Sequence, residues 1–160
     1  MIRINIKLFF ILLVLFLIDV VKPLGYSLVL EFLFLGIIFV SLNESIVQPL
    51  VLSIFFGFLK DLFILESSAF SFIEFPLICL FVRYCLSYFS FVSRQSYIMI
   101  VRIVIPAAAI FIHLVFNSIC IGRVFVSFSL VFFAQSFIMF YFMANLLEKW
   151  ARLNLPRTIS

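Results

Sequence analysis

Residues that could take part in catalysis are few and widely spaced in this chain of 160 residues. The chain has one histidine, His113, with Asn117 one helical turn later and no carboxylate nearby in the sequence. It lacks the motifs of nucleophilic hydrolases, nucleotide-binding loops and Cys/His metal sites. We predict that the protein is not an enzyme and binds no cofactor or metal ion. His113 is then a packed, hydrogen-bonded histidine, with a proton relay or ligand site as the alternative.

Glu31 and Lys60 are charged residues inside apolar stretches. A charge among apolar helices is costly unless it is paired, so Glu31 is expected to pair with a cation at the same end of the predicted helices. Lys22, Lys60 and Arg123 are the candidates, and a transport or partner site is the alternative. Lys60 directly precedes Asp61, but adjacent helical side chains diverge by about 100°, so these two need not pair.

A polar ridge runs along the apolar stretch from Pro49 to Leu65. Pro49, Ser53, Gly57 and Asp61 recur every four residues and therefore share one helical face. Ser53 and Gly57 form a small-xxx-small pair, which allows a second helix to approach closely. We predict that Ser53, Gly57 and Asp61 make a helix-packing or partner contact and that the other helices are built around this stretch.

Ser71 and Glu74 have the spacing of a capping box. In that motif the hydroxyl caps the start of a helix, and the acidic side chain bonds back to the capping residue. Pro76 follows two residues later, as expected near a helix start. We therefore predict that Glu74 caps the first turn of a helix.

Composition decides the class of protein. The chain is 67% hydrophobic and 11% charged, with a mean hydropathy of +1.38, whereas soluble domains are about 25% charged. This composition predicts an all-α integral membrane protein embedded in the lipid bilayer. The net charge of +4 is explained by basic residues at cytoplasmic helix ends, so no nucleic-acid partner is predicted.

The apolar runs predict one polytopic domain over residues 1–160 that folds as a six-helix transmembrane bundle. We interpret the first run as an uncleaved span because no small-x-small cleavage site follows it. The predicted helices cover about residues 4–21, 26–42, 46–65, 70–89, 97–121 and 124–147.

The distribution of Lys and Arg predicts the orientation in the membrane. With the N-terminus inside, the outer segments hold three basic residues, Lys22, Lys60 and Arg123. The inner segments hold eight, which are Arg3, Lys7, Arg83, Arg94, Arg102, Lys149, Arg152 and Arg157. This excess predicts a multi-pass protein with both termini in the cytoplasm.

The chain resembles the rod shape-determining protein MreD family. The resemblance is carried by Gly57-Phe58-Leu59-Lys60-Asp61-Leu62 on the third predicted helix, by the length and helix count, and by the basic tail. The chain departs from the family pattern after Asp61, where Ile64-Leu65-Glu66-Ser67-Ser68-Ala69 has no glycine. Lys60 also stands where the family usually has an apolar residue.

The resemblance implies a non-enzymatic scaffold of the bacterial inner (plasma) membrane that takes part in cell shape and positions peptidoglycan synthesis. Its implied partners are a single-span MreC-like protein, the MreB-containing elongation complex and the peptidoglycan synthases. The family is also similar in fold to the substrate-binding subunits of energy-coupling-factor transporters. The alternative function is therefore a membrane subunit that binds a small, vitamin-type molecule.

Overall fold

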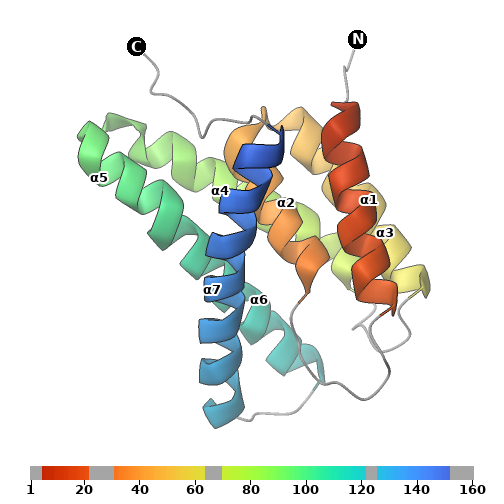
Figure 1. Ribbon diagram of the computed structural model, residues 1–160. Helices are drawn as coiled ribbons and strands as arrows, with labels where there is room; N and C mark the ends of the chain where they lie inside the picture. Colours follow the sequence, from red (N-terminus) through yellow and green to blue (C-terminus); the bar gives the residue numbers. More distant parts are fainter. Residues whose placement is uncertain (1–4, 22–30, 64–69, 122–125, 152–160) are drawn as a thin grey trace.

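The computed structural model describes residues 5–21, 31–63, 70–121 and 126–151, and all elements in these ranges are helical (Figure 1). The predicted all-α class is confirmed, whereas the six-span transmembrane arrangement stays a prediction. In chain order the elements are α1 (Ile6–Val21), α2 (Phe32–Asn43), α3 (Val47–Phe63), α4 (Ser71–Tyr88), the 3-10 turn η1 (Phe89–Phe91), α5 (Arg94–Met99), the π-helical η2 (Ile100–Val104), α6 (Ile105–Ile121) and α7 (Val126–Ala151).

Several helix ends differ from those predicted. Glu31 has extended backbone angles, φ −90° and ψ 95°, and stands at the N-cap of α2 instead of inside the helix. The predicted start at residue 26 lies outside the described residues. At the other end of the chain, α7 continues to Ala151, beyond the predicted end at residue 147.

The helix predicted over residues 97–121 begins earlier, at Arg94, and passes through α5, η2 and α6 without a break. The π-helical turn directly precedes Pro106. Proline has no N–H to donate to the carbonyl four residues earlier, and its ring crowds that carbonyl. This lost hydrogen bond explains why the helix widens locally at η2.

The central helix is α2, not α3 as the sequence predicted. All residues from Leu33 to Leu42 are buried, and α2 contacts α1, α3, α4 and α7. The α2 sequence FLFLGIIFVSLN is apolar on all sides, which is typical of a helix surrounded by other helices. By contrast, α3 leaves one apolar face exposed, including Phe55, Phe58 and Leu62.

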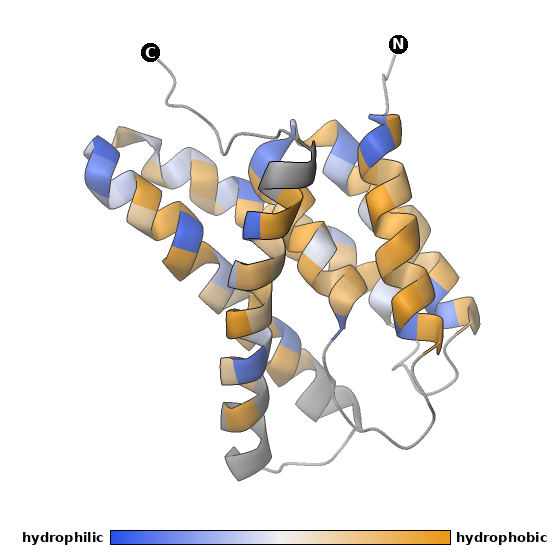
Figure 2. Ribbon diagram, viewed as in Figure 1, coloured by the Kyte–Doolittle hydropathy of each residue, from blue (hydrophilic) through white to orange (hydrophobic). Residues whose placement is uncertain are grey.

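The described helices consist mostly of apolar residues (Figure 2), and many of their large apolar side chains are exposed. Exposed large hydrophobic side chains occur on α1, α3, α4, α6 and α7, whereas soluble monomers rarely expose extended apolar patches. Within the described residues, the segments Ser71–Phe91 and Arg94–Phe116 are long and apolar enough to cross a membrane. Phe32–Asn43 and Phe133–Leu147 are shorter apolar helices.

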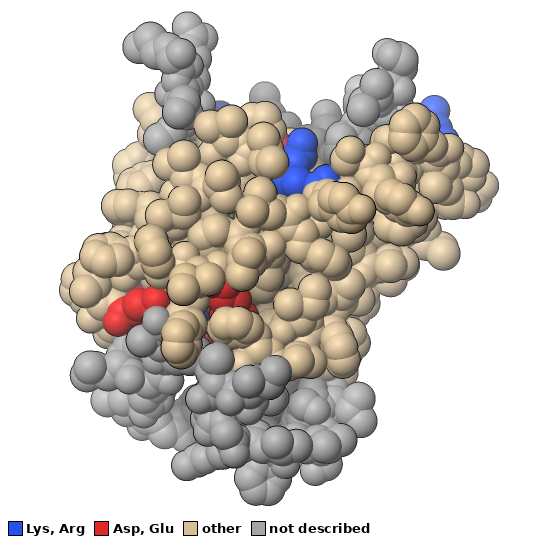
Figure 3. Space-filling model, turned by 180° about the vertical axis from the view of Figure 1, so that it is seen from behind, with Lys and Arg blue, Asp and Glu red and all other residues tan. Residues whose placement is uncertain are grey.

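The charged residues separate toward two ends of the molecule, as the view from behind in Figure 3 shows. We call the end where α1 begins and α7 finishes the basic end (Figure 1). It carries Lys7 in the first turn of α1, Arg94 at the start of α5, and Arg83, which lines the same cavity as Arg94. The opposite end, which we call the acidic end, carries Asp19 near the end of α1 and Asp61 near the end of α3. The start of α1 and the end of α7, the first and last described helices in the chain, therefore lie at the same end of the molecule.

The central position of α2 leads to a stability prediction. Phe39 on α2 is 1% exposed, whereas Phe111 on α6 is 61% exposed. Phe39→Ala should lower the free energy of unfolding by about 2–3 kcal/mol, because it leaves a cavity and loses packing contacts. Phe111→Ala, the matched control, should change it by less than about 0.5 kcal/mol. Thermal unfolding in detergent measures both, and equal effects would contradict the central placement of α2.

Candidate functional site: a buried chain of ionisable side chains

Asp61 caps the start of α4. Its Oδ1 accepts a hydrogen bond from the backbone N–H of Ser71 at 3.1 Å, and its Oδ2 accepts one from that of Phe72 at 2.9 Å. The first N–H groups of a helix have no partner within the helix, and a carboxylate at this position also interacts favourably with the helix dipole. Asp61 therefore makes an internal contact between α3 and α4.

Gly57 permits that contact, because α3 and α4 approach each other closely there. A Cβ at position 57 would lie 2.5 Å from the carbonyl oxygen of Ser71 and 3.0 Å from Cα of Phe72. Both are backbone atoms, so they cannot move aside as a flexible side chain can. Ser53 on the same face is fully buried, and its hydroxyl donates to the carbonyl of Leu50 at 2.8 Å. The ridge predicted from the sequence is therefore used in helix packing.

Asp19 plays the same part for α2. Its carboxylate accepts from the backbone N–H groups of Phe32 at 3.1 Å and Leu33 at 2.7 Å. Asp19 is 8% exposed. The sequence analysis did not identify this residue, because an aspartate near a helix end is usually a solvated turn residue. The distance along the chain from Asp19 to Phe32 hides the relation between them.

Four ionisable side chains form a continuous chain near the acidic end. Nζ of Lys60 lies 2.5 Å from Oε2 of Glu31. The same Glu31 oxygen lies 3.5 Å from Nε2 of His113, whose Nδ1 lies 2.6 Å from Oε1 of Glu74. The order is Lys60, Glu31, His113, Glu74, and we call these residues the ion chain. They come from α3, the N-cap of α2, α6 and α4, so the ion chain connects four helices.

The ion chain is shielded from solvent. Lys60, Glu74 and His113 are each less than 5% exposed. The His113 ring stacks on Phe34 with ring centroids 3.9 Å apart and an interplanar angle of 18°. Nζ of Lys60 lies 5.1 Å from the centroid of the Phe75 ring, within cation–π distance. Aromatic rings from α2 and α4 thus cover a site at which unpaired charge would be strongly unfavourable.

The geometry limits where the protons of the ion chain can be. Each ring nitrogen of His113 faces a carboxylate oxygen. Both contacts are favourable if the ring carries two protons, or if it carries one and a carboxyl group supplies the other. The second Glu74 oxygen, Oε2, is buried without a hydrogen-bond partner among the described residues. The contacts of Glu31, His113 and Glu74 therefore join α2, α6 and α4.

The structure brings Glu31, Lys60 and His113 together from among the residues proposed for polar pairing. Asn117 follows one turn after His113 on α6, and its side chain lies outside the described residues. The alternative partners of Glu31, Lys22 and Arg123, also lie outside them. Gly57 and Asp61 instead lie at the contact between α3 and α4, and Ser53 is buried on the same face of α3.

The capping box predicted from Ser71 and Glu74 is wrong. Phe70, not Ser71, is the N-cap residue of α4. The hydroxyl of Ser71 is buried without a hydrogen-bond partner among the described residues, and Asp61 caps the helix instead. Glu74 is consequently available to His113, a pairing that the sequence analysis missed. The sequence does contain an indication of this pairing. Glu74 and the single histidine lie on different apolar helices, and each requires a buried polar partner.

Among the described residues, no group of three or more His, Cys, Asp or Glu side chains is arranged to hold a metal ion. Comparisons of the chain with models of protein families, with curated proteins and with solved structures gave no match. The functional argument therefore depends on the geometry of the chain itself.

The contact at Gly57 leads to a prediction with a built-in control. Gly57→Ala should lower the free energy of unfolding by about 1–3 kcal/mol, because the new methyl group meets the backbone of α4. Gly36→Ala is the control: its methyl would meet the side-chain ends of Leu15 and Leu12, at 2.5 and 2.9 Å. Those side chains can rotate, and alanine favours the helix, so we expect a smaller change. The account fails if Gly36→Ala is the more destabilising substitution.

The ion chain leads to a double-mutant prediction. Lys60→Met should destabilise the protein by about 3–5 kcal/mol, because it breaks the 2.5 Å contact between Nζ of the buried Lys60 and Oε2 of Glu31. Adding Glu31→Gln should recover part of that loss, since the carboxylate charge that Lys60 faced is then removed as well. Denaturant unfolding of the two single variants and the double variant gives the interaction energy. Additive effects would show that Lys60 and Glu31 do not interact.

Proposed function

We propose that this chain is a multi-pass protein of the bacterial inner membrane that acts as a scaffold of the cell-elongation machinery. The observation that carries the proposal is the geometry of Gly57-x-x-x-Asp61. Gly57 admits the backbone of α4, and Asp61, four residues farther along α3, caps that helix. The motif behind the resemblance to the MreD family thus has a structural task, which is to fix one helix against the next.

A membrane location is supported by the surface. Exposed apolar side chains cover several helices, and two segments are long and apolar enough to cross a bilayer. Charged side chains gather toward the two ends (Figure 3), and Arg83 and Arg94 line one cavity at the basic end. Because basic residues favour the cytoplasmic side, we place the basic end, and with it both termini, in the cytoplasm.

A scaffold role is supported by the use of the polar groups. The carboxylates of Asp19 and Asp61 are used as helix caps, and Glu31, Lys60 and Glu74 lie in ionic contacts between helices. These contacts hold the helices in fixed relative positions. A rigid bundle of this kind suits a protein that positions a single-span MreC-like partner, the MreB-containing complex and the peptidoglycan synthases.

A second candidate is a membrane subunit that binds a small molecule. It is favoured by a cavity of about 640 Å³, a volume within the usual range for ligand sites. However, the cavity lies at the basic end, which we place in the cytoplasm. A vitamin-type uptake subunit needs a site that opens outward, so this placement favours the scaffold.

The scaffold role predicts a shape phenotype. Depletion of the protein in its rod-shaped host should produce rounded cells and disperse new peptidoglycan, and the MreC-like protein should co-purify with the wild-type chain. Asp61→Leu should both lower the abundance of the protein and disturb the rod shape of the cells, because it removes the cap of α4. Asp61→Asn should have a milder effect, since an amide oxygen can still accept one hydrogen bond. Normal rods after depletion would overturn the proposal.

The orientation predicts the result of reporter fusions. A fusion after Ser160 and one between η1 and α5, at Val92 and Ser93, should both report the cytoplasm. An extracytoplasmic signal from the fusion at Ser160 would contradict the proposed topology. Immunoblots of both fusions control for differences in protein level.

A further inference from the structure

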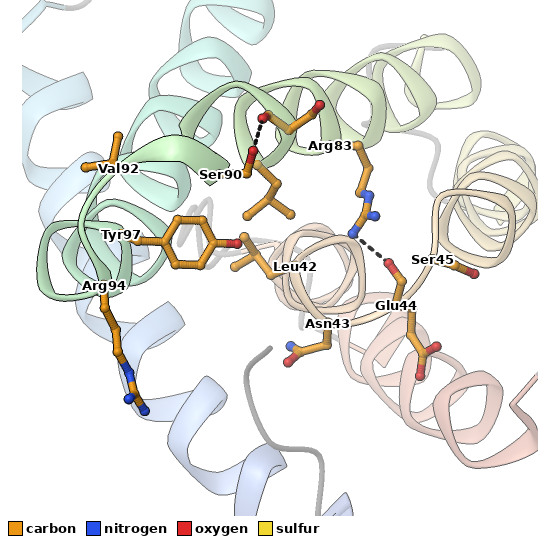
Figure 4. Close-up of a pocket in the computed structure, with 11 residues that line it drawn as sticks. Leu42, Asn43, Glu44, Ser45, Arg83, Ser90, Val92, Arg94 and Tyr97 are labelled. Carbon is orange, nitrogen blue, oxygen red and sulfur yellow. Dashed lines mark hydrogen bonds between the residues drawn. The ribbon is translucent and has the colours of Figure 1, made fainter. Parts of the chain in front are cut away.

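A second polar site, separate from the ion chain, lies at the basic end (Figure 4). The cavity of about 640 Å³ lies between the end of α2, the end of α4 and the start of α5. Its polar lining comes from all three elements and includes Asn43, Glu44, Arg83, Ser87, Arg94 and Tyr97. The proposed scaffold role does not use this cavity.

The position of the cavity matches the surface of a bilayer. It lies where the segment Ser71–Phe91 ends and the segment Arg94–Phe116 begins, which are the two segments suited to cross a membrane. The turn between two successive spans lies at the membrane–water boundary. Lipid headgroups occupy that boundary, so a headgroup can enter the cavity from the side.

The cavity contains the donors that recognise phosphate. Nη1 of Arg83 donates to the carbonyl of Glu44 at 2.8 Å, which fixes the guanidinium beside the end of α2 (Figure 4). A guanidinium has five N–H donors, so others remain for a ligand. Arg94 lies across the cavity, exposed, with its side chain extended away from Arg83. Its long side chain can rotate toward a bound phosphate, and arginine binds phosphate through paired hydrogen bonds.

One further feature suits a whole headgroup. Beside the cavity, and sharing Ser87 with it, lies a hollow lined by Tyr84, Tyr88 and Phe91. These aromatic side chains are 67–95% exposed, and tyrosine is typical of the headgroup level of membranes.

We propose that this cavity binds the phosphate-bearing headgroup of an anionic phospholipid. The phosphate contacts Arg83 and Arg94, and the glycerol region lies along Tyr84 and Tyr88. The proposal depends on the membrane location of the chain and not on its role in cell elongation, so either one can fail alone.

The test is native mass spectrometry of the purified full chain in detergent with dioleoyl phosphatidylglycerol or dioleoyl phosphatidylcholine. Wild type should retain phosphatidylglycerol at concentrations where phosphatidylcholine is lost. Arg94→Gln should weaken that binding about tenfold, which corresponds to 1.4 kcal/mol. Arg83→Lys keeps the charge but loses the paired geometry, so it should also weaken binding. Lys7→Gln removes one charge from the basic end outside the cavity and should leave binding unchanged.

The outcomes separate the alternatives. Equal retention of the two lipids, or an equal loss with Lys7→Gln and Arg94→Gln, would overturn the proposal, because binding would then reflect general charge. Inorganic phosphate is the second probe. If it displaces phosphatidylglycerol at comparable concentration, the cavity takes free phosphate and the lipid assignment is wrong. Unfolding temperatures of all variants identify any substitution that acts through the fold, and Arg94→Gln should match wild type there.

Discussion

The structure depends on the pairing of charges that the apolar bundle cannot hold singly. Lys60, Glu31, His113 and Glu74 lie at successive contacts of 2.5, 3.5 and 2.6 Å, and each comes from a different element. Breaking a contact between buried charges costs far more than losing a surface ion pair. These polar contacts therefore help to specify which helices meet.

Near the acidic end, two aspartates cap neighbouring helices in the same way. Asp19 and Asp61 each lie two residues before the end of their helices, α1 and α3, and each caps the helix that follows. A cap of this kind contributes about 1 kcal/mol, and Gly57 lets the backbones come close enough for the second cap to form. Near the acidic end, these two carboxylates are therefore used in internal contacts between helices. A cavity with a polar lining lies at the other end of the molecule, the basic end.

Sequence alone was sufficient for the all-α class and for the face shared by Gly57 and Asp61, because composition and a four-residue period are local properties. It was not sufficient for the central helix. A helix that is apolar on all sides has the same sequence pattern whether other helices or lipid surround it. Only the fold shows that other helices enclose α2. The pairing of His113 with Glu74 was also missed, because the two residues are 39 positions apart. In the sequence, Glu74 instead follows Ser71 by three residues, which is the spacing of a capping box.

The most direct test of the ion chain is a distance measurement at its centre. The chain has one histidine, so ¹⁵N-labelled histidine reports His113 alone in a solid-state NMR experiment. With glutamate labelled at its side-chain carboxyl carbon by ¹³C, the Nδ1 signal should show strong dipolar dephasing from Glu74, and Nε2 a weaker effect from Glu31. Glu74→Gln should abolish the dephasing at Nδ1 and leave the Nε2 effect in place. A ring nitrogen signal without dephasing in the wild-type protein would contradict the account.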